Sequence, residues 1–160
     1  TEQGLNEQIF STLLERIEFE VPDTMVDYEL EHIVSDAERA FSYHNMSMEQ
    51  IGMTHQHLRE TYRDTALKQV KRHLILGKII DQEALALSEE ELTRGYETMA
   101  QTFHQPVAEI RKFYETAENQ ERLAYFKHTL LEKKAIELII NGSDIEEVAA
   151  ELASEAKEGA

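Results

Sequence analysis

The chain has 160 residues, and 41% of them are apolar, which is enough to build a core and excludes disorder along the whole chain. Its formal net charge of −16 makes nucleic acid a poor partner, and the absence of cysteine excludes disulfide and thiol chemistry. Only six glycines and two prolines are present, which favours long helices over a turn-rich β fold.

The N-terminal part of the chain predicts two helices joined by a short extended segment. Apolar side chains recur at every fourth position over residues 5–18, which is the spacing of one helix face. Residues 18–21 alternate between polar and apolar, which predicts an extended backbone. Pro22 then suits the first turn of a helix that we expect over residues 22–44.

A break follows, and then the longest predicted helix. Ser47 and Gln50 have the spacing of a capping box, and Gly52 suits a helix stop. Thr54 can cap a helix that we expect to continue to about Leu87.

The C-terminal half predicts four more helices. We expect them over residues 88–103, 106–114, 118–140 and 143–158. Ser88 with Glu91, and Ser143 with Glu146, have capping-box spacing, and Asn141-Gly142 ends the helix between them. No strand pair is expected. The sequence therefore predicts an all-α fold in a single domain over residues 1–160.

No catalytic, metal or cofactor site is predicted. The seven histidines include no H-E-x-x-H motif, and His55 and His57 lie two positions apart, so on a helix they point in different directions. There is no P-loop, G-x-G-x-x-G or G-x-S-x-G motif. No apolar run reaches the length of a membrane span, and the N-terminus has no signal-peptide pattern. The chain begins inside an expected helix, which suggests a fragment.

Five segments, in this order and spacing, carry a family resemblance. They are Glu18–Pro22 with Met25-Val26 and Glu29-Leu30, Gly52–Thr54 with Leu58–Glu60, Val70-Lys71 with Leu74–Ile79, Leu87–Leu92 with Met99-Ala100, and Leu130–Ala135. Together they resemble the C-terminal domain of the bacterial trigger factor family, over about residues 5 to 141. The segment from Ser143 onward carries no matching motif.

The resemblance implies a fold and a function. The family's C-terminal domain is an elongated multihelical body with two arm-like extensions, similar in fold to the periplasmic chaperone SurA. It cradles unfolded or nascent polypeptide in the bacterial cytoplasm and uses neither ATP nor a membrane. In that family a G-F-R-x-G-K loop docks on the ribosome and an FKBP-like domain isomerises X-Pro bonds. This sequence contains neither, so we expect no ribosome docking and no isomerase activity from it, while self-association stays open.

Two groups of apolar residues are candidates for binding such clients. The first lies in a polar stretch around the predicted break and holds three of the chain's five methionines, a residue type that adapts to many partners. The second lies on one stripe of the helix over residues 88–103. The candidates are Phe41, Tyr43, Met46, Met48, Ile51 and Met53 in the first group, and Tyr96, Met99 and Phe103 in the second. For both groups, inward packing in the core is the alternative.

Charge is unevenly distributed along the chain. Residues 59–78 hold six Lys and Arg against two acids, and residues 144–158 hold six acids against one Lys. These are either solvated helix faces or surfaces for intramolecular or client contacts. A helical dimerisation or adaptor module that binds one folded partner is the alternative to the chaperone interpretation.

Overall fold

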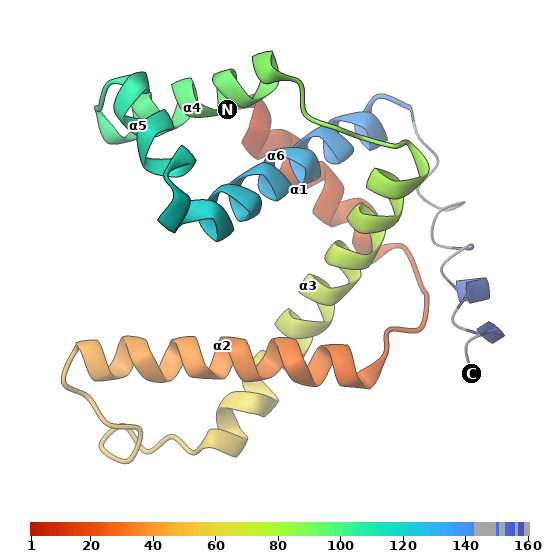
Figure 1. The fold of residues 1–160 in the computed structure, drawn as a ribbon. Coiled ribbons are helices and arrows are strands. Elements are labelled where there is room, and N and C mark those ends of the chain that lie inside the picture. The colour runs from red at the N-terminus through yellow and green to blue at the C-terminus, as the bar shows by residue number, and fades with distance from the viewer. Residues whose placement is uncertain (143–149, 151–152, 156, 159–160) are drawn as a thin grey trace. The chain divides into compact units, whose positions relative to one another are not determined.

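The described residues of the computed structural model form an all-α fold, as the sequence predicts (Figure 1). The structure describes residues 1–142, 150, 153–155 and 157–158. Six α-helices and one 3-10 helix span those residues up to Gly142: α1 (Glu2–Glu15), α2 (Asp23–Tyr43), α3 (His55–Gln82), α4 (Glu89–Phe103), α5 (Val107–Glu115), η1 (Ala117–Asn119) and α6 (Gln120–Ile140). The predicted helix over residues 143–158, with its Ser143–Glu146 capping box, falls largely outside the described residues.

The prediction for the end of α3 is wrong by about five residues. The helix stops at Gln82 instead of Leu87. Ala84 adopts the left-handed conformation with φ 46°, and the amide of Leu85 donates to the carbonyl oxygen of Ile80 at 2.9 Å. That bond closes the helix end as in a Schellman motif, although glycine is the usual residue at this position.

The same closure recurs at two other helix ends without glycine. Asn45, with φ 55°, follows α2, and the Met46 amide donates to the Phe41 carbonyl oxygen at 2.9 Å. His104, with φ 54°, follows α4, and the Gln105 amide donates to Ala100 at 3.0 Å. The carbonyl groups at these ends are therefore satisfied by the backbone itself.

The chain divides into two compact units. Unit 1 comprises Thr1–Phe10 and Leu76–Asp144, and unit 2 comprises Ser11–Ile75 and Ile145–Ala160. The helices α1 and α3 each contribute residues to both units. The expectations of a single domain over residues 1–160 and of arm-like extensions stay predictions.

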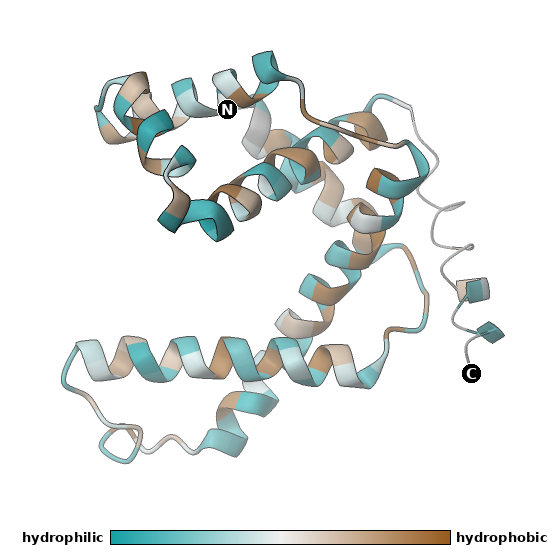
Figure 2. Cartoon of the chain, in the orientation of Figure 1, coloured by the Kyte–Doolittle hydropathy of each residue, from teal (hydrophilic) through white to brown (hydrophobic). Residues whose placement is uncertain are grey.

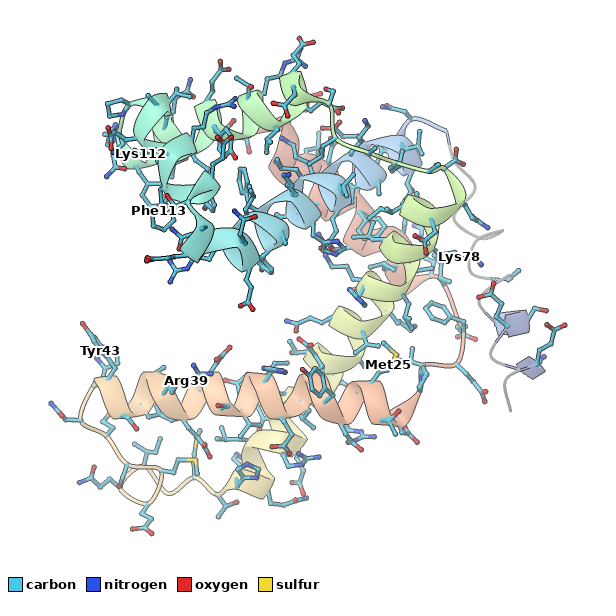
Figure 3. The ribbon with its side chains drawn as sticks, in the orientation of Figure 1. Met25, Arg39, Tyr43, Lys78, Lys112 and Phe113 are labelled. Atoms are coloured by element: carbon cyan, nitrogen blue, oxygen red, sulfur yellow. The ribbon has the colours of Figure 1, made fainter. Side chains whose placement is uncertain are left out.

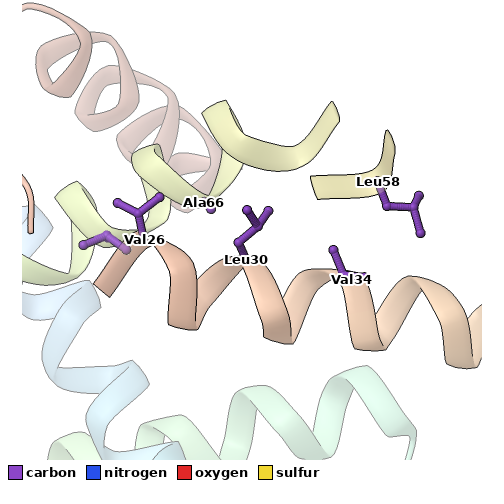
Figure 4. Packing of buried hydrophobic residues seen from close by; sticks show 6 residues of the cluster. Val26, Leu30, Val34, Leu58 and Ala66 are labelled. Carbon is purple, nitrogen blue, oxygen red and sulfur yellow. The ribbon is translucent and has the colours of Figure 1, made fainter. Parts of the chain in front are cut away.

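Unit 2 is built on the packing of α2 against α3. Buried Val26, Leu30 and Val34 recur every fourth residue along α2 and face α3 (Figure 4). Leu58, Ala66 and Val70 supply the opposing side from α3. Polar residues lie between these positions, so apolar and polar colours alternate along each ribbon (Figure 2). The 3.6-residue period of the sequence thus determines which faces meet.

Unit 1 has its own core, formed by α4, α5 and α6. Buried Leu92, Tyr96 and Ala100 line one face of α4, and Ile110 of α5 joins them. Three rings stack in this core: the Tyr96 and Phe126 centroids lie 5.6 Å apart and those of Tyr114 and Phe126 lie 4.8 Å apart. Such stacking adds to the free energy gained from burying the rings.

Candidate functional site

The first group of candidates lies at the end of α2 and in the turn that joins α2 to α3, residues 44–54. Ser47 and Gln50 form the predicted capping box: the Ser47 amide donates to Gln50 Oε1 at 3.0 Å, and the Gln50 amide donates to Ser47 Oγ at 3.3 Å. Gly52, with φ 69°, lets the Met53 amide reach the Met48 carbonyl oxygen at 2.9 Å. Local hydrogen bonds therefore fix the positions from which the candidate side chains project.

The six candidates at the end of α2 and in this turn divide into two sets of three. Phe41, Met48 and Met53 pack against the core of unit 2. Tyr43, Met46 and Ile51 remain exposed, with 85%, 40% and 37% of each residue's surface accessible. Figure 3 shows Tyr43 at the end of α2, directed away from the helix. We name these three exposed side chains the apolar tip. Core packing thus accounts for half of the candidates and leaves the other half available to a partner.

The second group does not form one surface. Tyr96 is 0% exposed, and Met99 packs against the same core. Only Phe103, at the end of α4, is exposed. For Tyr96 the core alternative therefore holds. Its place in a three-ring stack leaves no ring surface for a client.

Sequence reasoning missed several exposed apolar side chains. Tyr28 of α2, Phe113 of α5, Tyr125 of α6 and Leu5 of α1 are all exposed. The first three lie off the apolar stripes of their helices. Leu5 lies on the stripe predicted over residues 5–18, but the structure exposes it, so the prediction is wrong for the start of that helix face. The Arg122 guanidinium lies 5.7 Å from the centroid of the Phe113 ring, and Figure 3 labels that ring at the end of α5. These side chains come from four different helices.

The basic stretch of α3 makes contacts within unit 2. Arg59 forms ion pairs with Glu31 and Asp27 of α2. Arg63 lies 3.8 Å from both Asp23 and Asp27. The intramolecular interpretation of this charge therefore holds for these arginines: they tie α3 to α2 on the polar side of their apolar contact.

The described residues offer neither a metal site nor a membrane-spanning helix. Among the described residues, no group of three or more histidine or acidic side chains could hold a metal ion. In the same part of the chain, no helix combines the length and apolar character needed to cross a membrane.

Comparison with known proteins places the chain among C-terminal segments of longer proteins. The family model described as "Bacterial trigger factor protein (TF) C-terminus" matches residues 1–141. The trigger factor of Desulfosudis oleivorans is 50% identical over 147 residues, which cover 92% of this chain and 33% of that protein. That of Desulforapulum autotrophicum is 48% identical over 160 residues, covering 100% of this chain and 35% of that protein.

A more distant relative, the trigger factor of Geotalea daltonii, is 27% identical over 147 residues. The chain spans about a third of the length of these curated relatives. No solved structure matches it significantly.

Proposed function

This chain belongs to the bacterial trigger factor family, as a counterpart of its C-terminal region, and from that premise we propose that it binds unfolded polypeptide and prevents its aggregation without ATP. The observation that supports this most directly is the apolar tip. Three large apolar side chains stand exposed at the end of α2 and in the following turn, which the Ser47–Gln50 hydrogen bonds brace. Apolar side chains clustered on a protein surface mark interaction sites.

The composition of the apolar tip suits weak and broad binding. Tyr43 offers a ring with a polar edge, and Met46 is unbranched and polarizable, so both adapt to different partner side chains. Full burial of such a side chain contributes about 1.5–3 kcal/mol before the cost of ordering both chains is subtracted. Three of them give modest affinity, as expected of a protein that must release its clients.

We assign the other activities of the family to parts of the relatives outside the matched region. The relatives align to this chain over only about a third of their length. Ribosome docking and proline isomerisation would then belong to the remaining two thirds. The proposed place of action is the bacterial cytoplasm, where nascent chains emerge.

The proposal is tested by light scattering from a denatured model protein diluted into buffer without nucleotide. We expect the chain to suppress scattering, and the triple variant Tyr43→Ser, Met46→Ser, Ile51→Ser to lose most of that effect. A control changes three exposed apolar residues elsewhere, Leu5, Tyr28 and Tyr125, to serine. It should retain most of the effect. Equal loss in both triple variants would remove the apolar tip as the site.

The same chain distinguishes a chaperone from an adaptor for one folded partner. A pull-down with several unrelated denatured proteins should capture all of them weakly. Capture of a single folded protein, with no binding to the denatured ones, would replace the proposed function with the adaptor alternative.

A further inference from the structure

Unit 2 contains a groove that none of its described helices fills. The groove runs between the end of α1 and the middle of α3 and has a volume of about 460 Å³. That volume falls within the range of ligand-binding clefts. Its apolar lining includes Leu14 of α1, which is 9% exposed, and half-buried Leu67 of α3. These two leucines are the apolar residues of its lining, and the other lining residues are polar or charged.

The rim of this groove carries more positive than negative charge. Lys68, Lys71 and Arg72 line it from α3, against Asp64 and Glu15. The Lys71 ammonium donates to the Ile17 carbonyl oxygen at 3.0 Å, which holds the segment after α1 against α3. The Lys68 ammonium lies 3.6 Å from the Glu15 carboxylate, and both side chains are about two-thirds exposed. An exposed pair of this kind is weak and can exchange partners.

The sequence supplies a segment with matching chemistry. Residues 143–158 carry Ile145, Val148, Ala149 and Leu152, which is the spacing of one apolar helix face. Six acids and one lysine lie over residues 144–158. An acidic amphipathic helix is the shape and charge that an apolar groove with a basic rim accepts.

We propose that the groove between α1 and α3 is the docking site for the acidic segment 143–158 of this same chain. The apolar stripe enters between Leu14 and Leu67, and the acids face Lys68 and Arg72. Because groove and segment are tethered, the effective concentration is on the order of millimolar, so weak complementarity suffices. The proposal stands without the proposed chaperone function.

Disulfide trapping tests this directly, because the chain contains no cysteine. The variant Thr65→Cys with Ala149→Cys places one thiol at the groove and one in the segment. The matched control, Ser42→Cys with Ala149→Cys, moves the first thiol to an exposed position on α2 of the same unit. Under mild oxidation, we expect the groove pair to form its bond within the chain at least tenfold faster than the control pair.

Charge reversal separates docking from chance collision. Lys68→Glu should slow the trapping severalfold, and adding Glu147→Lys with Glu151→Lys should restore it. High salt should slow trapping in the unmodified pair, because it screens exposed charges. Equal trapping rates in the groove and control pairs, with circular dichroism confirming that both are folded, would overturn the proposal. Bonds formed mainly between two chains would overturn it too, since a second copy would then occupy the groove.

Discussion

The Lys134 ammonium of α6 lies 2.8 Å from a carboxylate oxygen of Glu91, in the first turn of α4. The same ammonium donates to the Ala86 carbonyl oxygen at 2.9 Å, so it also holds the segment that precedes α4. Glu91 in turn completes the capping box, since its carboxylate accepts the Ser88 amide at 2.8 Å. One ion pair thus joins the start of α4 to the neighbouring helix of unit 1.

This arrangement predicts a pH dependence of stability. The Lys134 hydrogen bond, followed by the one from the Ser88 amide, lowers the pKa of Glu91 to about 2, from an ordinary value of 4.5. A lowered pKa in the folded state contributes stability that is fully present above pH 4.5 and is lost as the pH falls toward 2. Thermal unfolding followed by circular dichroism should show wild type melting above Glu91→Gln at pH 7, with the difference shrinking below pH 4.5. A difference that stays constant over this range would contradict the assignment.

Tyr96 carries a buried hydroxyl that makes no hydrogen bond of good geometry in the described part of the chain, although the Glu115 carboxylate lies nearby. Burial raises the pKa of Tyr96, and the nearby Glu115 acts in the same direction, so the phenol stays neutral. An unsatisfied buried polar group costs about 1–3 kcal/mol. We therefore expect Tyr96→Phe, which keeps the ring stack, to increase the free energy of unfolding by about 1 kcal/mol in urea titrations. Tyr114→Phe, at the half-buried neighbour, serves as the control and should change it little.

Two helical glycines should respond in opposite ways to alanine. A Cβ on Gly77 of α3 would meet nothing within 4 Å, whereas one on Gly95 of α4 would lie 2.8 Å from Leu130 Cδ1 and 3.1 Å from Phe126 Cζ. Alanine in a helix is favoured over glycine by about 0.5–1 kcal/mol. Gly77→Ala should gain that amount of unfolding free energy, and Gly95→Ala should lose stability because it displaces packed side chains. Equal gains in both variants would show that the Leu130 and Phe126 side chains can move aside without cost.

The signals that sequence reasoning used are local, and the local features are the ones it predicted. The capping box at Ser88 and Glu91 depends on four consecutive residues, and the structure forms it as predicted. The left-handed Ala84 has no such signal, because alanine does not favour that conformation. Contacts distant in sequence stabilise this region instead, including the bond from Lys134 to Ala86.

Composition indicates the end of α2 and the following turn as a candidate site. It does not indicate which of the candidate side chains are exposed and which pack inward. A turn has no repeating period, so the sequence does not indicate which of its side chains face inward. Met46 and Met48 are two positions apart, yet one is exposed and the other packs against the core of unit 2. Tertiary contact with α2 and α3 decides that outcome.

Arg59 should contribute more to stability than a typical surface arginine. It pairs with Glu31 and Asp27 across two helices, and its side chain is only 25% exposed. Exposed ion pairs contribute about 0–1 kcal/mol, so we expect Arg59→Ala to cost roughly 1 kcal/mol of unfolding free energy. The control Arg39→Ala removes an exposed pair with Asp36 in the same helix and should cost much less. The Arg59 effect should also decrease in high salt, and two equal losses would show that the cross-helix pairs contribute nothing extra.

The two sets of side chains at the end of α2 and in the following turn should differ in their effect on stability. Met48 and Met53 pack partly into the core of unit 2, whereas the apolar tip of Tyr43, Met46 and Ile51 is exposed. Half-burial of two methionines contributes about 2 kcal/mol in total, half the value for full burial. Met48→Ser with Met53→Ser should therefore lower the melting temperature by about 4–8 °C, since 1 kcal/mol corresponds to about 2–4 °C at this chain length.

The triple serine variant of the apolar tip should lower it by no more than about 2 °C, because exposed side chains contribute little to stability. The effects on suppression of aggregation should be reversed. The triple variant should lose this activity, and the double variant should retain it at temperatures where it is folded. If the triple variant instead melts as low as the double variant, the apolar tip is part of the core and cannot be the client site.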